Sequence, residues 1–226
     1  MLFAMMDFKA KLVSVKELTH DVRMYMFERP AGFSFKPGQF VMLQVEEVAR
    51  AYSIASSPLE LENFVLIVKL IEGGRGSEYL RAAKAQDEIS FKGPFGHFYL
   101  DEDSERDVVL IGTGTGLAPL YSILQYLLES GSEREIKLFF GVRHEEDVFL
   151  REEFEDLSQK HENFSFKIIL SRPKSGEKGY VTDLIKEENI ENSEAYICGG
   201  KAMVDDVKEF FTQKGISPEH IKHEVY

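Results

Sequence analysis

The stretch VVLIGTGTGLAP, residues 108–119, decides the fold of this chain. Four aliphatic residues have the character of a short buried strand and run directly into glycines at 112, 114 and 116. Glycines let the backbone turn tightly and let a phosphate approach, and a helix N-terminus behind them offers free N–H groups. The spacing is neither G-x-G-x-x-G nor a P-loop, so a plain tight turn is one interpretation. The strand before and the helical pattern after favour the other, a phosphate-binding turn of Gly112, Thr113, Gly114, Thr115 and Gly116.

Downstream of this turn, strand and helix patterns alternate to the last residue. Alternation of this kind predicts a parallel sheet with helices on both faces, an α/β nucleotide-binding domain over residues 103–226. The expected helices are 117–129, 148–160, 181–187 and 201–214, and the expected strands after the first are 136–142, 164–170, 195–198 and 221–226.

Upstream of the turn the apolar pattern is short and alternating, as in half-buried strands. Apolar residues alternate at 8, 10 and 12, at 22, 24 and 26, and at 41, 43 and 45, with turn residues between the runs. The nearly continuous apolar run 64–71 is typical of a central strand. Short strands at this spacing predict an antiparallel Greek-key β-barrel over residues 1–102, and the charged stretch 101–107 marks the boundary.

Composition excludes several classes of function. The net charge of -12 argues against nucleic-acid binding, which needs clustered Lys and Arg. With Cys198 as the single cysteine, no disulfide within the chain, four-thiolate iron–sulfur cluster or multi-cysteine zinc site can form. The six histidines lack metal-ligand spacing, so no metal site is expected. We expect neither a signal peptide nor a membrane span, and therefore a soluble, cytoplasmic protein.

The segment Arg50-Ala51-Tyr52-Ser53, in the barrel half, resembles the Arg-x-Tyr-Ser flavin motif of the ferredoxin–NADP reductase family. The resemblance implies that Arg50 pairs with the FAD pyrophosphate, Tyr52 packs on the isoalloxazine ring and the Ser53 hydroxyl points at flavin N5. The residue types suit these roles, because a guanidinium matches phosphate oxygens and an aromatic face suits a flat ring.

Further segments resemble the same family in the same order, so the likeness covers nearly the whole chain. Ile67-Val68-Lys69 resembles the strand along the flavin ribose and adenine, and residues 73–77 resemble a second phosphate loop in which Gly76 and Ser77 offer N–H groups. Residues 93–96 resemble the turn that closes the barrel, and residues 196–201 resemble the Tyr-x-Cys-Gly segment beside the nicotinamide.

The last three residues, Glu224-Val225-Tyr226, resemble the C-terminus of plant-type members. The resemblance implies that Tyr226 stacks on the flavin face that nicotinamide must reach, and that Glu224 sits near the hydride-transfer centre; a frayed end is the alternative. It also places Cys198 and Gly199 beside nicotinamide C4, with Cys198 positioning the ring rather than acting as a nucleophile. Plain packing is the alternative for a buried cysteine.

The choice between NADPH and NADH depends on a basic group of residues. Ser171-Arg172 resembles the pair that holds the 2′-phosphate in NADP-dependent members, and Lys178 and Tyr180 match a basic residue and an adenine-stacking tyrosine. Arg143 adds charge, and clustered cations suit a phosphate dianion. NADH-dependent relatives also carry Ser-Arg-Pro, so NADH is one alternative. A solvated basic loop without a role in nucleotide binding is the other. NADPH is the preferred prediction.

The resemblance implies a flavoprotein reductase that moves a hydride from nicotinamide C4 to flavin N5 and then single electrons to an acceptor. The first hypothesis is a stand-alone reductase of ferredoxin or flavodoxin. Alternatives are a flavin or ferric reductase, the reductase component of an oxygenase, and an electron-transfer subunit of a larger complex.

Overall fold

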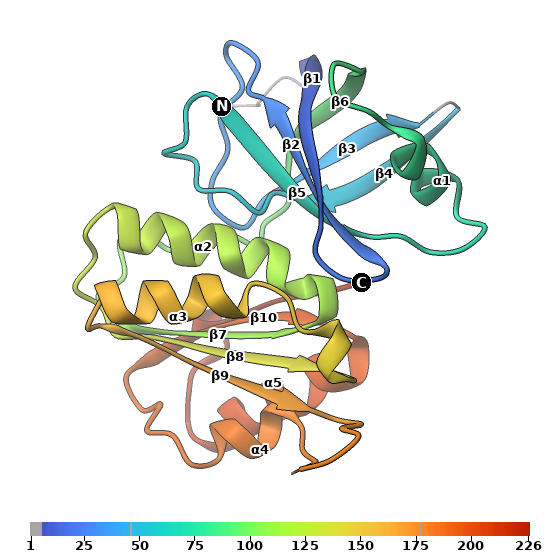
Figure 1. Cartoon of the computed structure of the whole chain (residues 1–226). Helices are drawn as coiled ribbons and strands as arrows, with labels where there is room; N and C mark the ends of the chain where they lie inside the picture. The colour runs from blue at the N-terminus through green and yellow to red at the C-terminus, as the bar shows by residue number, and fades with distance from the viewer. Residues whose placement is uncertain (1–5, 46, 177) are drawn as a thin grey trace.

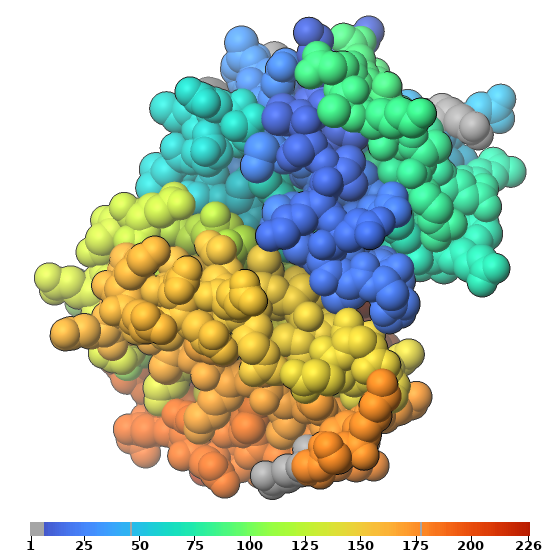
Figure 2. All heavy atoms as spheres, in the orientation of Figure 1, coloured from blue at the N-terminus to red at the C-terminus, as the bar shows by residue number. Residues whose placement is uncertain are grey.

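The computed structural model describes residues 6–45, 47–176 and 178–226. Two sheets organise the chain (Figure 1): a six-stranded antiparallel sheet is built from the N-terminal part, and a five-stranded parallel sheet from the C-terminal part. On the face drawn in Figure 2, the blue atoms of the first part meet the yellow atoms of the second along a continuous seam. No helix in the described ranges is long and apolar enough to cross a membrane.

The antiparallel sheet forms a barrel with strand order β4-β3-β6-β1-β2-β5. The barrel closes where Ile54, the residue after β4, forms a bridge with Leu66 of β5 and the Ala55 N–H donates to the Val65 carbonyl at 2.7 Å. One helix covers an end of the barrel. The elements are β1 Met6–Glu17, β2 Val22–Glu28, β3 Phe40–Val45, β4 Val48–Ser53, β5 Asn63–Lys69, α1 Arg75–Ala82 and β6 Glu88–Phe95.

The prediction that residues 64–71 form a central strand is wrong, because β5 lies at the end of the strand order. Its continuous apolar run has another cause. Phe64, Leu66 and Val68 fill the barrel core, whereas Ile67 packs against the second domain, so both faces are buried. β2 is divided in the same way: Val22 and Met24 face the second domain, and the barrel core takes Tyr25 and Phe27.

The parallel sheet has strand order β11-β10-β7-β8-β9, as expected for a nucleotide-binding α/β domain. Helices α2 and α3 cover the face nearer the barrel, and α4 and α5 cover the other (Figure 1). The strands are β7 Asp107–Thr113, β8 Ile136–Val142, β9 Phe164–Leu170, β10 Ser193–Gly199 and β11 Ile221–Val225. The helices are α2 Leu117–Glu129, α3 Arg151–Lys160, α4 Val181–Ile185 and α5 Lys201–Gln213, with single 3₁₀ turns η1 Gly114–Gly116, η2 Glu145–Asp147 and η3 Pro218–His220.

The predicted ranges of α2, β8 and β9 are confirmed, while the other three helices are shorter than expected, α5 by one residue at its end. Helix α3 begins at Arg151 rather than 148, because Leu150 adopts a left-handed conformation (φ 60°) and Phe149 is buried ahead of it. Helix α4 ends at Ile185 rather than 187. The predicted boundary at 102/103 stays a prediction; it falls in the segment between β6 and β7.

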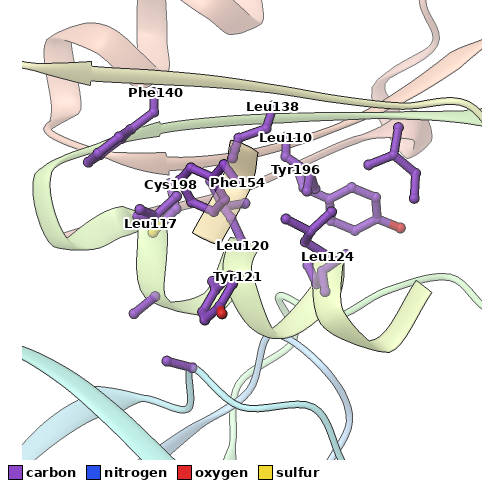
Figure 3. Packing of buried hydrophobic residues seen from close by; sticks show 14 of the residues in the cluster. Leu110, Leu117, Leu120, Tyr121, Leu124, Leu138, Phe140, Phe154, Tyr196 and Cys198 are labelled. Atoms are coloured by element: carbon purple, nitrogen blue, oxygen red, sulfur yellow. The ribbon is translucent and has the colours of Figure 1, made fainter. Parts of the chain in front are cut away.

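An apolar core joins the two domains (Figure 3). Helix α2 packs its buried residues against the sheet, among them Leu117, Leu120 and Leu124. The same cluster includes Val22, Ala55 and Ile67 of the barrel. Because buried apolar contact of this kind resists separation, the nucleotide-binding sheet and the barrel are held in one arrangement.

Candidate functional site

The glycine-rich turn lies at the carboxyl edge of the parallel sheet, between β7 and α2. A Cβ on Gly112 would lie 2.8 Å from Leu120 Cδ1, and one on Gly116 only 2.2 Å from the Cys198 carbonyl oxygen. Gly116 is therefore required for the close approach to β10, because the Cys198 carbonyl is backbone, whereas a Cβ on Gly112 would displace the end of a leucine side chain; a plain tight turn already explains both glycines. Thr113, Gly114 and Thr115 are only half-buried and face a cavity.

That cavity, about 660 Å³ in volume, lies between the two domains. Ligands of open parallel sheets bind at this position, beyond the carboxyl ends of the strands. It gathers eight of the residues expected to bind cofactors, from both domains: Lys69, Thr113, Gly114, Thr115, Arg143, Ser171, Tyr180 and Tyr226. The side chains of Arg172 and Lys178 are exposed and do not line it.

The flavin-motif strand β4 and the start of α1 lie against each other. A Cβ on Gly76 would lie 2.6 Å from Tyr52 Oη and 3.1 Å from Arg50 Cγ. The structure therefore brings together the two segments expected to hold phosphate. Gly76 and Ser77 belong to the first turn of α1, which begins at Arg75, so the helix starts within the stretch 73–77 that was expected to be a loop.

The side chains of this motif differ in their surroundings. Arg50 is exposed, and its guanidinium donates to the neighbouring Ala49 carbonyl at 3.0 Å. Tyr52 packs against the barrel core, and burial raises the pKa of its hydroxyl. Ser53 is half-buried, and its hydroxyl has no hydrogen-bond partner among the described residues. The Ser77 hydroxyl, by contrast, accepts the Ile71 N–H at 2.9 Å and so fixes its own loop.

Strand β5 presents backbone groups to the same region. In an antiparallel pair of strands, every second residue directs its N–H and C=O groups to the neighbouring strand, and the residues between direct theirs to the other side. Because the Leu70 N–H donates to the Asp21 carbonyl, the even-numbered residues of β5 bond toward β2. Ile67 and Lys69 turn their N–H and C=O groups to the opposite edge, where pairing ends at Leu66. The Ile67 and Val68 side chains are buried in packing, so any ligand contact here is made by main chain.

Tyr226 lies over the glycine turn. Its hydroxyl donates to the Thr113 carbonyl, and its N–H donates to the Gly199 carbonyl at 3.4 Å. A Cβ on Gly114 would lie 3.0 Å from Tyr226 Oη, although the residue is 62% exposed. Tyr226 thus covers part of the glycine turn, and its side chain remains accessible from the cavity.

Cys198 is 3% exposed and pairs across the ladder with Glu224. Burial, and then the charge of Glu224, raise the pKa of the Cys198 thiol far above its usual range. A thiol in such an environment is unreactive, because the thiolate is the nucleophile. Burial also raises the pKa of Glu224, so its carboxyl holds a proton to higher pH than a free glutamate.

Several cavity residues carried no signal in the sequence, among them Thr19, Asp21, Asp147, Met203 and Asp206. They belong to no motif, and only the docking of the two domains brings them together. Asp21 pairs with Lys69 at 2.8 Å across the β2–β5 edge. Asp147 and Asp206 add negative charge to a cavity in which basic residues were expected to dominate.

The two regions suit two different dinucleotides. Strand β4, the first turn of α1 and the side of β5 that faces away from β2 offer a guanidinium, a hydroxyl, helix N–H groups and main-chain groups, which suit the pyrophosphate and ring system of a flavin. The interdomain cavity combines glycine backbone, threonine hydroxyls and Arg143, which suits a nicotinamide dinucleotide. Fold and site together define a two-domain oxidoreductase that uses FAD and NAD(P)H.

Comparison with known proteins gives the family. Residues 9–99 match the oxidoreductase FAD-binding domain, and residues 110–209 match the oxidoreductase NAD-binding domain. The chain belongs to the ferredoxin–NADP reductase-like family of FAD- and NAD(P)-binding oxidoreductases.

Three relatives illustrate the range of this family. Ferredoxin–NADP reductase B of Sorangium cellulosum (strain So ce56) is 38% identical over 237 residues, which cover 97% of each chain. The ferredoxin–NAD(P)(+) reductase component of a Pseudomonas putida naphthalene 1,2-dioxygenase system is 34% identical, over 94% of this chain and 67% of that protein. The crystal structure of an Amycolatopsis cytochrome P450 reductase superposes with a TM-score of 0.90 at 29% identity, over 98% of this chain and 70% of that one.

Proposed function

We propose that the protein transfers electrons from NADPH, through FAD, to a small one-electron carrier of the ferredoxin or flavodoxin type. One observation carries the proposal: the interdomain cavity is lined both by the glycine turn of the α/β domain and by Lys69 of barrel strand β5, the strand that resembles the family's flavin-lining strand. A relative named ferredoxin–NADP reductase that matches over 97% of both chains supports the choice of acceptor.

In this proposal the barrel, residues 1–102, holds FAD. Arg50 pairs with the pyrophosphate, and the N–H groups of Gly76 and Ser77 bind it from the first turn of α1. Tyr52, next to Ala51, packs along the flavin, and Ser53 directs its unpartnered hydroxyl to N5. The contact between Gly76 and the pair Arg50–Tyr52 supports a single shared phosphate site. Ile67 and Lys69 contribute main-chain groups, with Val68 as structural support.

The α/β domain, residues 103–226, holds the nicotinamide nucleotide and the junction with the flavin. When bound, FAD supplies the chemistry that accepts a hydride and releases electrons singly. Cys198 and Gly199 position the nicotinamide, and Glu224 holds a proton nearby. Tyr226 shields the glycine turn and moves aside when nicotinamide enters; its hydrogen bond to Thr113 and its exposure support this role.

We assign the nucleotide preference to NADPH. Arg143 and Ser171 line the cavity beside Tyr180, which is exposed and free to stack on adenine. The Arg172 N–H donates to the Arg143 carbonyl at 2.8 Å, so the two basic residues are held side by side, with Lys178 on the same loop. A 2′-phosphate gains from this clustered positive charge, whereas a 2′-hydroxyl gains little.

A second candidate function is that of the reductase component of an oxygenase. The 34% identity to a dioxygenase reductase component favours it. In that case the acceptor is an oxygenase or its ferredoxin rather than a diffusible carrier of general metabolism. Gel filtration with candidate carriers separates these: a shift with an oxygenase component and none with ferredoxin or flavodoxin selects the second function.

The test of the main proposal is anaerobic spectroscopy of the purified protein loaded with FAD. NADPH and NADH are added separately, and flavin bleaching at about 450 nm is followed, a wavelength at which oxidised flavin generally absorbs. Faster bleaching with NADPH is the expected result. Faster bleaching with NADH keeps the reductase and reverses the nucleotide assignment, and failure to bind FAD refutes the proposal.

A further inference from the structure

The backbone immediately after Ser53 is held by helix α2 of the other domain. The Ser122 hydroxyl donates to the Ser56 carbonyl at 2.6 Å, and Gln125 Nε2 donates to the Ala55 carbonyl at 2.8 Å. These two contacts are here termed the interdomain hydrogen bonds. Ser122 is 0% exposed, so its bond to Ser56 is shielded from water. The two acceptors lie two and three residues beyond the hydroxyl proposed to face the flavin.

The same short segment is also fixed from the barrel side. The Ile54 N–H donates to the Gln39 carbonyl at 2.9 Å, and the Ser56 hydroxyl accepts the Val65 N–H at 3.0 Å. With the barrel supplying these contacts and α2 supplying the others, residues 54–56 are held from both domains. A segment with so many bonds in a buried setting has little freedom to shift.

Helix α2 is also the helix that starts at the glycine turn. Ser122 lies five residues after Leu117, roughly 7.5 Å along a rigid helix. The helix that begins at the glycine turn therefore also forms hydrogen bonds, one to two turns further along, with the segment that follows the flavin motif. The interdomain hydrogen bonds therefore connect α2 directly to the segment after Ser53, in addition to the apolar core that the two domains share.

We infer that Ser122 and Gln125 are positioning residues for hydride transfer, an inference that rests on the proposed function. Neither belongs to a cofactor motif, and neither lines the interdomain cavity. Hydride transfer requires reacting atoms about 3–3.5 Å apart, and a displacement of about 1 Å can cost about 100-fold in rate. Two hydrogen bonds that fix the segment after Ser53 against α2 act on that distance.

The first experiment measures flavin reduction by stopped flow in Ser122→Ala, with FAD loaded and nicotinamide saturating. The reduction rate is expected to fall about 10-fold, a fraction of the loss from a 1 Å displacement, with FAD and nicotinamide dissociation constants unchanged. Long-wavelength charge-transfer absorbance between the two rings should weaken in parallel. Ser130→Ala is the control, because that serine follows the last residue of the same helix and its hydroxyl donates to the Leu127 carbonyl within its own domain.

Hydrogen exchange supplies a readout that does not depend on turnover. In Ser122→Ala the amides of residues 54–66 are expected to exchange faster, and in Ser130→Ala they are not. Faster exchange with an unchanged reduction rate would make the two bonds structural only and overturn the inference. An unchanged rate together with unchanged exchange would overturn it as well, as would a rate restored merely by adding FAD.

Gln125→Glu gives a second, nearly isosteric variant in case Ser122→Ala folds poorly. An ionised carboxylate cannot donate to the Ala55 carbonyl, whereas a protonated one can. The reduction rate relative to the unmodified protein should therefore be low at pH 8 and recover as the pH falls toward the pKa of the new glutamate. A ratio that does not change with pH contradicts the positioning role of Gln125. Absence of bleaching in the unmodified protein would instead refute the proposed function itself.

Discussion

The flavin side and the nicotinamide side of this molecule both place glycines at the start of a helix, yet for different reasons. At α1, the lack of a side chain on Gly76 leaves room for the side chains of Arg50 and Tyr52 on strand β4. At α2, Gly112 and Gly116 make room for the helix itself against the sheet. The same sequence feature thus accommodates side chains of strand β4 in one domain and close helix–strand packing in the other. Substitution of the glycine at α1 should therefore affect FAD affinity, whereas substitution of a glycine at α2 should affect stability.

The largest effect is expected from Gly116→Ala. The new Cβ would meet the Cys198 backbone carbonyl, which cannot rotate away, so the cost is overpacking of roughly 1–3 kcal/mol or more. Thermal unfolding should shift downward by about 2–4 °C per kcal/mol for a chain of this size. The control is Gly200→Ala, where a Cβ meets nothing within 4 Å and the backbone is ordinary (φ -64°). Equal melting temperatures for the two variants would contradict the packing role of Gly116.

Arg50→Ala should act on the flavin and leave stability almost untouched. A lost charge-assisted hydrogen bond to phosphate is worth about 1.5–3 kcal/mol, or about 10–100-fold in FAD affinity. The ratio of flavin absorbance to protein after gel filtration measures the loss. Arg81→Ala, an exposed arginine in the last turn of α1, serves as control. Full flavin retention in Arg50→Ala would remove the pyrophosphate role.

Gly76→Ala tests the comparison most directly. Its Cβ would press on the far end of the Tyr52 side chain and on Arg50 Cγ, both able to move, so the melting temperature should change little. FAD affinity should fall about 10-fold, because displacing Arg50 sacrifices part of its bond to phosphate. Isothermal titration with FAD measures the affinity. A large drop in stability with unchanged FAD affinity would show that Gly76 serves close packing, as Gly116 does.

The smallest effect is expected at Tyr226. Tyr226→Ser removes the ring over the glycine turn and the hydrogen bond to Thr113, which should lower the nicotinamide dissociation constant a few-fold and narrow the preference for NADPH over NADH. Because the side chain is largely exposed, stability should change by less than about 0.5 kcal/mol. Val225→Ser, also exposed, is the neighbouring control. Identical nucleotide affinities in the two variants would argue against a gating role for Tyr226.

Local sequence pattern by itself determined much of this protein. The bounds of α2, β8 and β9 follow from short apolar runs bounded by turn and charged residues: β8 is almost continuously apolar, polar residues alternate with apolar ones in the first half of β9, and α2 is a longer apolar segment. The flavin motif of β4 and the glycine turn after β7 are also recognisable in the sequence, since each lies within a few consecutive residues.

Tertiary structure decided whatever depends on contact between distant segments. Strand β5 is apolar along its length because a second domain covers its outer face, which periodicity alone cannot separate from a central position. Asp147 and Asp206 enter the cavity, and Gln125 reaches Ala55, only after the domains dock. A hydrogen bond between residues 70 positions apart leaves no mark in local sequence, because each partner is chosen by the fold and not by its neighbours in the chain.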